Sequence, residues 1–551
     1  MGKKQTWKKR HEDVTSIEQA HLKNLNASSR DEIAEWEKKG REDSYWLAGV
    51  KEFCKTVWEN RNNMIFIIGD YDADGITATA ILYLALTWLG FNVKYLIPHR
   101  FTQGYGMNRS IIDKVGEKPS LIITVDNGIA AADAVAYAKS KGHTVIVTDH
   151  HEPVKTAEEI RLPNADLIID PKIMPGLADF TGYCGAGIAY KLARALLKDA
   201  RGMHILLIPL AAIGTICDQM PIREENFYIV KTALYILNNY NGQKAGKDYV
   251  LPGIKALGKA LGISTWKIDS IAYQAGPAIN SAERMKDGKA SDVVKMLTEN
   301  SLYAASVIAD ELTELNGERK SLVADAVQEA LQDIECDAYG RPLYPIVKYI
   351  PSASEGIIGI IAAKIMEEYN LPAAVFTDSY ADAGILKGSF RTVDGFSIID
   401  LLRKCGDVFA GYGGHSGAAG ASVKKEGFSN MVKTLHEKAA EIGVPDPVKY
   451  YDCEIREKDI AEAIEKNEQF APLDLIFKVT DFVPEMKFGE WEKKLRGNGV
   501  KLWSKNAEAV GFNLHDVPEI DSPSPLTIYG KIGMNVFNGR STPQVTMIDI
   551  E

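Results

Sequence analysis

The chain has 551 residues, which is too long for one compact core, so three or four domains are expected. Hydrophobic residues make up 46% and charged residues 25%, an ordinary globular composition that excludes a largely disordered or fibrous protein. The formal net charge of −10 argues against a protein that coats nucleic acid through bulk positive charge, although it leaves a nucleic-acid enzyme open.

No apolar run is long enough for a membrane span, and the first residues contain no apolar signal core. The six cysteines are scattered without a CxxC spacing, so neither a disulfide framework nor a thiolate zinc site is expected. We therefore expect a cytoplasmic protein with no membrane association.

Residues 1–60 are rich in Lys, Glu and Trp at helical spacing, and they predict an N-terminal helical segment. Short Ile- and Val-rich runs then alternate with helical stretches. The predicted strands are Ile65–Ile68, Val93–Ile97, Leu121–Val125, Val145–Val147 and Leu167–Ile169. Continuous apolar strands between helices are typical of an α/β fold with a doubly wound parallel sheet, which binds ligands beyond the carboxyl ends of its strands.

Four further parts follow from the pattern along the chain. The sheet and a mostly helical continuation predict one domain over residues 61–298. Residues 299–336 predict one long amphipathic helix that connects two domains. Strand and helix signals alternate again over residues 337–444, as in a smaller α/β domain, and residues 445–551 predict an all-β domain.

Three carboxylates follow the first predicted strand at alternating positions, namely Asp70, Asp72 and Asp74. Carboxylates this close repel one another unless a cation lies among them. An EF-hand calcium loop would need a glutamate twelve positions from its start, where this chain has Ile81. The segment therefore predicts a metal site of another kind.

Acidic and imidazole side chains also follow two later strands: Asp126 after the third, and Asp149, His150 and His151 after the fourth. The carboxyl ends of parallel strands lie at one edge of a sheet, so these groups are expected to converge. Asp218 closes a later apolar segment and, by itself, reads more readily as a helix cap. A mixed Asp and His set favours Mn²⁺ or Mg²⁺ over zinc and predicts metal-assisted hydrolysis of a phosphate ester.

Four motifs in this order resemble those of the DHH phosphoesterase superfamily. They are DYDADG (70–75), VDNG (125–128), DHH (149–151) and GTICD (214–218). A later GGH (413–415) resembles the associated DHHA1 domain. Further segments, including HRFTQGYGMN (99–108) and PAINSAERM (277–285), resemble the RecJ family of bacterial single-strand-specific exonucleases, from about residue 60 to the end of the chain.

The resemblance implies two Mn²⁺ or Mg²⁺ ions. The implied ligands are Asp70 or Asp72, Asp74, Asp126, His150 and Asp218. Asp126 would bridge the two ions, while Asp149 and His151 would support and orient the ligands. His415, after Gly414, would approach the scissile phosphate; the local alternative for this GGH stretch is a tight turn between a strand and a helix.

The resemblance also implies contacts with a nucleic-acid strand. They are Arg100, Ser389 and Arg391 for a 5′-terminal phosphate, and Asn280 and Arg284 for the strand near the cleft. An arginine fork matches a phosphate bidentately, and a hydroxyl adds a donor. Relatives usually have a histidine in the segment where this chain has Ser354 and Glu355, which places one strand contact in question.

The last domain would be an OB-fold. Residues 486–505 hold six basic residues together with Phe488, Trp491 and Trp503, a combination that suits a groove in which bases stack along a single strand. The alternative is a charged hairpin that packs its tryptophans inward.

The function that the resemblance implies is a divalent-metal-dependent 5′-to-3′ exonuclease that hydrolyses single-stranded DNA to mononucleotides, in DNA repair and recombination. The expected substrate is single-stranded DNA with a 5′ phosphate, and the expected protein partners of a monomer are a single-stranded-DNA-binding protein and a helicase. One alternative is a DHH phosphodiesterase of short oligonucleotides or cyclic dinucleotides, against which the terminal domain argues. Another is a catalytically inactive replication scaffold, which should have lost ligands that are all present here.

Overall fold

The computed structural model describes residues 6–155, 160–173, 175–198, 200, 202–239, 249–285, 289–446, 448–485, 499–512, 514, 524–537 and 540–551. The chain divides into two compact units: the first contains Lys39–Pro445, and the second combines Lys4–Lys38 with Asp446–Glu551. Within the described residues, none of the helices has the length and apolar character that crossing a membrane requires.

A parallel sheet of five strands, in the order β3-β2-β4-β5-β8, begins the first unit. Its strands are β2 (Ile65–Gly69), β3 (Val93–Leu96), β4 (Leu121–Val125), β5 (Thr144–Thr148) and β8 (Leu167–Ile169). These are the strands that the apolar runs predict. A short antiparallel pair, β6 (Val154–Lys155) and β7 (Ile160–Arg161), lies outside this sheet.

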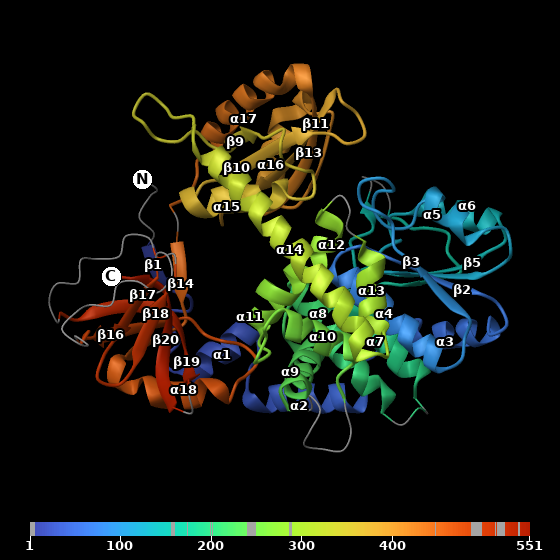
Figure 1. Ribbon diagram of the computed structural model, residues 1–551, viewed down its shortest axis with the longest axis horizontal. Coiled ribbons are helices and arrows are strands. Elements are labelled where there is room, and N and C mark those ends of the chain that lie inside the picture. The colour runs from blue at the N-terminus through green and yellow to red at the C-terminus, as the bar shows by residue number, and fades with distance from the viewer. Residues whose placement is uncertain are drawn as a thin grey trace. The chain divides into compact units, whose positions relative to one another are not determined.

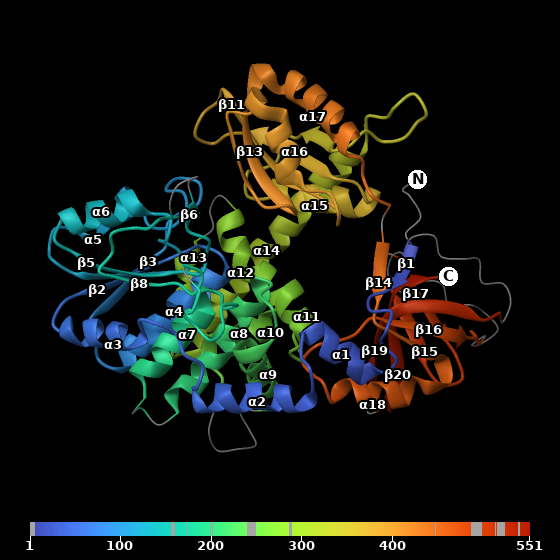
Figure 2. The same ribbon diagram turned by 180° about the vertical axis from the view of Figure 1, so that it is seen from behind.

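Helices cover both faces of the sheet, as Figure 2 shows. The helices around it are α3 (Val50–Glu59), α4 (Ala73–Trp88), α5 (Arg109–Val115), α6 (Ala132–Ser140) and α7 (Gly185–Leu196). Successive side chains of a strand point to opposite faces. Ile65 and Ile67 of β2 accordingly pack in the core with α4 and α7, whereas Phe66 and Ile68 pack in a smaller core with α5 and α6. The doubly wound α/β sheet is confirmed.

A helical layer completes this domain, and a long helix leaves it. The helices are α8 (Ile208–Cys217), α9 (Glu224–Asn239), α10 (Pro252–Ala260), α11 (Ile268–Ser270), α12 (Gly276–Arg284), α13 (Ala290–Thr298) and the long α14 (Leu302–Leu331). Ser301 caps α14 by accepting a hydrogen bond from the N–H of Ala304.

The second α/β domain lies in the same unit and has a five-stranded sheet in the order β12-β13-β11-β10-β9. Its strands are β9 (Ile346–Tyr349), β10 (Ala373–Asp378), β11 (Ile385–Arg391), β12 (Gly411–Gly414) and β13 (Ala418–Lys424). Its helices are α15 (Ile358–Tyr369), α16 (Ile398–Cys405) and α17 (Phe428–Ile442). Only β9 and β10 pair in parallel among these strands.

The second unit is built on a six-stranded sheet in the order β15-β16-β19-β20-β18-β17. Its strands are β15 (Cys453–Arg456), β16 (Phe477–Phe482), β17 (Val500–Trp503), β18 (Glu508–Gly511), β19 (Leu526–Phe537) and β20 (Arg540–Ile550). The predicted β domain is thus present and is consistent with an OB-like domain, with one helix, α18 (Ile460–Glu468), that the sequence analysis did not anticipate.

The predicted N-terminal segment, residues 1–60, is divided between the two units: Lys4–Lys38 belong to the second unit, and the residues from Lys39 belong to the first. Strand β1 (Thr6–Lys9) pairs in parallel with β14 (Val448–Tyr451), as Figure 1 shows, and α1 (Ile17–Leu25) packs against α18. The ring of Trp7 stacks on that of Tyr529, with centroids 4.2 Å apart, and its Nε1 donates a hydrogen bond to Asp549 (2.8 Å). The remaining N-terminal helix is α2 (Arg30–Glu42).

Most of the predicted basic and aromatic groove falls on residues 486–498, including Phe488 and Trp491, which lie outside the described residues. Two of its members are described on β17. The ammonium of Lys501 lies 2.8 Å from the carboxylate of Glu508 and 4.9 Å from the ring centroid of Trp503.

Candidate metal centre

The first acidic segment turns directly from β2 into α4. Asp70 is buried after the end of the strand, and Asp72 caps the helix by accepting hydrogen bonds from the N–H groups of Asp74 and Gly75, both 3.0 Å long. A Cβ on Gly75 would lie 2.7 Å from the Cβ of Asp70, so glycine permits this close turn. The turn therefore holds its carboxylates on one short loop.

Asp74 holds the beginning of a second helix. Its two carboxylate oxygens accept hydrogen bonds from the N–H groups of Gly185 (2.7 Å) and Ala186 (2.8 Å), the first residues of α7. The positive end of a helix dipole stabilises a carboxylate at this place. Asp74 therefore has a structural role in addition to its place in the acidic segment.

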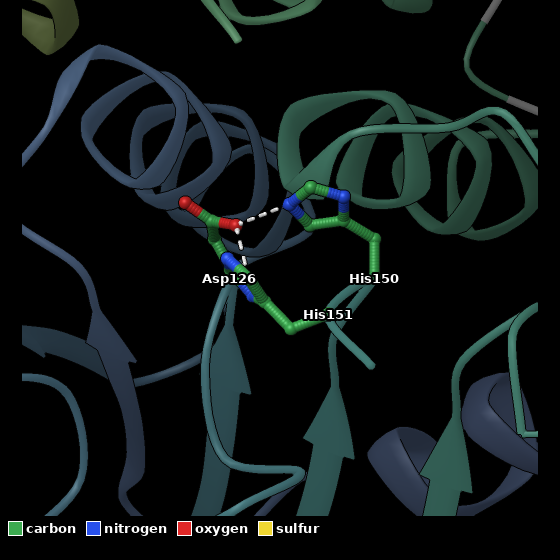
Figure 3. A group of neighbouring side chains, drawn as sticks. All are labelled: Asp126, His150 and His151. Carbon is green, nitrogen blue, oxygen red and sulfur yellow. Dashed lines mark ion pairs between the residues drawn. The ribbon is translucent and has the colours of Figure 1, made fainter. Parts of the chain in front are cut away.

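Asp126 and the two histidines come from the ends of neighbouring strands, β4 and β5. Asp126 adopts a left-handed backbone conformation (φ 61°), which aspartate tolerates better than most residues. Its Oδ1 lies 3.0 Å from Nε2 of His150 and 4.0 Å from Nδ1 of His151, and in Figure 3 dashed lines join this one oxygen to both rings. The convergence expected at the sheet edge is present.

Three overlapping groups of side chains could each hold a metal ion, with the ligand atoms of each group within 4.8 Å of one another. They are Asp126 with His150 and His151, Asp74 with His150 and Asp218, and Asp70 with Asp72 and Asp126. The structure thus brings together all six candidate ligands, including both Asp70 and Asp72, which the resemblance leaves as alternatives. Asp218 follows α8 as its C-terminal cap residue, so the helix-cap interpretation and a place in the cluster both hold.

The carboxylates of this cluster oppose one another's ionisation. Burial, reinforced by the neighbouring carboxylates, raises the pKa values of Asp70, Asp72 and Asp126. Burial and the charge of Asp74 raise the pKa of Asp218 to about 7. Such a cluster is stabilised by a cation that compensates its charge.

Unused hydrogen-bonding capacity also fits a bound cation. Within the described residues, Oδ1 of Asp70 and Oδ1 of Asp126 are buried and have no hydrogen-bond partner, although Nε2 of His150 lies 3.0 Å from the latter. Burial and the charge of His151 lower the pKa of His150 to about 4, so His150 is neutral at pH 7, as a metal ligand must be. Carboxylate oxygens with a neutral imidazole suit Mn²⁺ or Mg²⁺.

Asp149 forms hydrogen bonds with both histidines and belongs to none of the three ligand groups. Its Oδ1 accepts hydrogen bonds from the backbone N–H of His150 (2.8 Å) and from Nδ1 of His151 (2.7 Å), and its Oδ2 accepts one from the N–H of Ile129 (2.9 Å). Burial opposes the protonated form of His151, but the hydrogen bond and charge of Asp149 outweigh it and raise the pKa of His151 to about 9. His151 is therefore a cation beside the carboxylates.

Two further residues of this edge escaped the sequence analysis. The hydroxyl of Tyr105 donates to the backbone carbonyl of Asp126 (3.1 Å), and its ring stands edge-on to His151. Asp170 follows β8, is buried, and has a pKa raised to about 7, chiefly by burial. Because Asp170 comes directly after a predicted strand, the strand-end rule could have found it. Tyr105 lies within the segment HRFTQGYGMN (99–108) of the resemblance, to which the sequence analysis assigns no role for this residue.

The implied strand contacts lie in the same unit. The Oδ1 of Asn280 accepts a hydrogen bond from the N–H of Ala73 (2.7 Å), so Asn280 supports the acidic loop. The guanidinium of Arg391 donates to the hydroxyl of Ser389 (3.2 Å), and that of Arg100 lies over the ring of Tyr71, 5.5 Å from its centroid.

Four arginines of the first unit, Arg100, Arg284, Arg319 and Arg391, interact electrostatically. Burial lowers the pKa of Arg284 to about 10, and the charges of Arg100, Arg319 and Arg391 lower it further in the same direction. None of the four forms an ion pair with a carboxylate of the described residues. A concentration of unpaired guanidinium groups is typical of a site for a phosphorylated ligand.

His415 belongs to the second α/β domain, in the exposed turn between β12 and β13, where its N–H donates to the carbonyl of Ala418 (2.8 Å). The stretch is thus a turn between two strands, not between a strand and a helix. A Cβ on Gly414 would lie 2.4 Å from that carbonyl oxygen, so the turn requires glycine. Among the described residues, no hydrogen bond or ion pair joins the ring of His415 to the carboxylate cluster.

Comparison with known proteins identifies the families that the two α/β domains match. A model of the DHH family, N-terminal domain, matches residues 64–215, and a model of the DHHA1 domain matches residues 344–441. Single-stranded-DNA-specific exonuclease RecJ of Bacillus subtilis is 32% identical over 92% of this chain and 64% of that relative, so the chain spans less than two thirds of that protein's length.

The protein of the same name from Escherichia coli is 32% identical over 72% of this chain and 70% of that relative. A crystal structure of exonuclease RecJ bound to manganese matches with a TM-score of 0.59 and 30% identity, covering 73% of this chain and 96% of that one. This chain belongs to the RecJ family.

Proposed function

We propose that this protein is a divalent-metal-dependent exonuclease that hydrolyses single-stranded DNA in the 5′-to-3′ direction and releases mononucleotides. The observation that carries the proposal is the convergence of six carboxylate and imidazole ligands at one edge of the parallel sheet of a RecJ-family chain. Relatives of this family are named for single-stranded-DNA-specific exonuclease activity.

Asp70, Asp72, Asp74, Asp126, His150 and Asp218 would hold two Mn²⁺ or Mg²⁺ ions. Asp126 and His150 each belong to two of the three ligand groups, and of these two only Asp126 has the two oxygens with which a side chain could serve both ions. When bound, such ions activate a water molecule and neutralise charge on the phosphate during in-line hydrolysis. The fit rests on the donor set and on the buried Asp70 and Asp126 oxygens without hydrogen bonds, and a relative's structure contains manganese.

His151 would act on the phosphate as a hydrogen-bond donor. Nδ1–H of the protonated ring donates to Asp149, which orients the ring and leaves Nε2–H available to the phosphate, while the side chain is 48% exposed and accessible to substrate. Asp149 is thus a positioning residue for His151. His415, which is exposed beside Gly414, would approach the scissile phosphate from the DHHA1 domain.

A 5′-terminal phosphate would bind to Arg100, Ser389 and Arg391. The Ser389 hydroxyl and the Arg391 guanidinium already contact one another (3.2 Å), and their partners include no carboxylate among the described residues. Gly359 at the start of α15 borders them, because a Cβ there would lie 2.9 Å from Nη2 of Arg391 and 3.0 Å from the Ser389 oxygen. Asn280 and Arg284 would position the following nucleotides.

We further propose a role in DNA repair and recombination, as a cytoplasmic monomer that works with a single-stranded-DNA-binding protein and a helicase. These proposals rest on membership of the family, and each requires its own binding or genetic experiment.

The test uses single strands of about 30 nucleotides, long enough to reach beyond one OB-fold site, labelled at either end and incubated with Mn²⁺. We expect immediate release of a 5′-labelled mononucleotide, gradual shortening of the 3′-labelled strand, and no cleavage of a duplex control. Cleavage confined to dinucleotides would favour a phosphodiesterase of short substrates. Absence of cleavage with either Mn²⁺ or Mg²⁺ would refute the proposal and favour an inactive scaffold.

A further inference from the structure

Helix α14 carries one stripe of buried side chains, which recur at alternating spacings of four and three residues. The stripe consists of Ala305, Ala309, Leu312, Asn316, Arg319, Val323, Ala326 and Ala330. Such spacing is the pattern by which a helix buries an apolar face. Two members, Asn316 and Arg319, are polar, and they stand at neighbouring positions in the middle of the stripe.

These two residues lie where α14 passes from one core to another. The stripe residues before them, up to Leu312, belong to the core of the DHH domain, and those after them, from Val323, belong to the core of the DHHA1 domain. Helix α14 packs against α12 of the former and α15 of the latter, and Figure 1 shows it continuing between them. A break in the apolar pattern at such a junction marks a functional or strained position.

The guanidinium of Arg319 is buried without a counter-ion. The residue is 7% exposed, and its Nε and Nη2 both donate to Oδ1 of Asn316, at 3.1 and 2.9 Å. Burial alone lowers its pKa, and within the described part of the chain no carboxylate pairs with it. A buried charge that is not compensated within the protein is costly, so an anionic ligand would stabilise it.

The neighbouring arginine lies on the helix that also supports the metal centre. Arg284 follows Asn280 by four residues on α12, and therefore lies about one helical turn, roughly 5–6 Å, further along the helix than the residue that supports the acidic loop. Its Nη1 is 3.4 Å from the carbonyl of Gly356, and its pKa is lowered partly by the charge of Arg319. Helices α12 and α14 pack against each other, so the two arginines stand on adjoining helices, next to the strand contacts proposed above.

We propose that Arg319 and Arg284 form a subsite for an internucleotide phosphate of the bound strand, next to the 5′-end pocket of Arg100, Ser389 and Arg391. Asn316 positions Arg319 by accepting its two hydrogen bonds. The proposal rests on the proposed exonuclease function and adds a residue that binds substrate rather than metal. Since Arg319 lies on the connecting helix, strand binding would involve both cores that α14 joins.

The test replaces one charged phosphate at a time by a neutral methylphosphonate, in 5′-phosphorylated single strands, and measures kcat/KM for hydrolysis of the preceding linkages. In the unmodified protein we expect one linkage near the 5′ end at which the replacement costs about 10- to 100-fold, the value of a charge-assisted hydrogen bond. In Arg319→Gln that position-specific cost should fall to about twofold or less, because the partner of the phosphate is gone. A merely structural role of Arg319 would lower the rate equally at every linkage.

Equal methylphosphonate costs in the original and Arg319→Gln proteins would overturn the proposal. Inhibition by inorganic phosphate that disappears in Arg319→Gln, without any position-specific methylphosphonate cost, would reassign the site to a free anion and also overturn it. Failure of the unmodified protein to cleave unmodified strands would instead refute the proposed function.

Arg403→Gln is the matched control, because Arg403 is exposed and pairs with Asp400 at 2.7 Å on the surface; it should retain the position-specific cost. If Arg319→Gln does not fold, Arg319→Met provides the same measurement with an uncharged side chain of similar length.

Discussion

Asp74→Asn and Asp126→Asn make the same chemical change at two carboxylates of the metal centre, but they should differ in their effect on the fold. Asp74 accepts hydrogen bonds with both oxygens at the start of α7, whereas Oδ1 of Asp126 accepts none within the described residues. An amide at position 74 leaves one buried N–H of Gly185 or Ala186 facing an NH₂ group. A hydrogen bond to a charged group is worth roughly 1.5–3 kcal/mol and an unsatisfied buried donor costs a similar amount, so we expect a local loss of about 2–4 kcal/mol.

At position 126 the exchange should be close to neutral for stability in the absence of metal. Burial and the surrounding carboxylates raise the pKa of Asp126, so an uncharged amide resembles the protonated carboxyl. Asparagine also tolerates the left-handed backbone conformation there (φ 61°). Both variants should nevertheless lose nearly all hydrolysis, because each removes a candidate metal ligand.

Hydrogen–deuterium exchange in EDTA measures the local effect. Amides at the start of α7 should exchange about 30- to 1000-fold faster in Asp74→Asn, the equivalent of the expected free-energy loss, and at an unchanged rate in Asp126→Asn. Exchange over α17 of the DHHA1 domain serves as an internal control. Unchanged protection of α7 in Asp74→Asn would refute the reasoning from its hydrogen bonds, and substantial hydrolysis by Asp126→Asn would refute its place as a ligand.

Three further outcomes are expected. Arg391→Lys should weaken the preference for a phosphorylated 5′ end about tenfold, since an ammonium cannot bind a phosphate bidentately; equal losses on phosphorylated and unphosphorylated strands would contradict this. Gly359→Ala should lower the same preference without changing the melting temperature, because its Cβ would displace only the flexible end of Arg391 and the Ser389 hydroxyl. Burial lowers the pKa of His21, which contacts Asn467 in the second unit, so the folded unit binds fewer protons than the unfolded chain. Its stability should be full above pH 6.5 and fall as the pH drops towards the lowered pKa, while His21→Gln should flatten this profile in urea unfolding.

The sheet and its ligand cluster could be predicted because their signals are local. Each strand is a short apolar run. Asp70 and Asp126 follow directly after such runs, and His150 follows one residue later, where parallel strands place their ends together. Asp170 follows directly after β8, so its place at the same edge of the sheet could have been predicted in the same way. The motif order added the ligand role of Asp218, which a local pattern presents only as a helix cap.

Features that depend on contacts distant in the sequence could not be predicted. The hydrogen bond from Trp7 to Asp549 joins residues 542 positions apart, and no sequence pattern near Trp7 indicates a partner at the other end of the chain. Likewise, the hydrogen bonds of Asp74 to α7 depend on where a helix more than a hundred residues later is packed. Arg319 belongs to the helix segment ELNGERK, which is part of the family resemblance, but its burial could not be predicted because it depends on how the cores on both sides of it close.

The pairing of β1 with β14 has a consequence for biosynthesis. A ribosome completes the whole first unit, Lys39–Pro445, before it begins the strands with which the N-terminal residues pair. During that interval the aromatic face of Trp7 and the apolar face of α1 have no partner in their own unit, and chaperones or aggregation can act on them. In sequence, the first unit is inserted between the two parts of the second unit. A deletion of N-terminal residues therefore removes part of a domain whose other residues are encoded near the end of the gene.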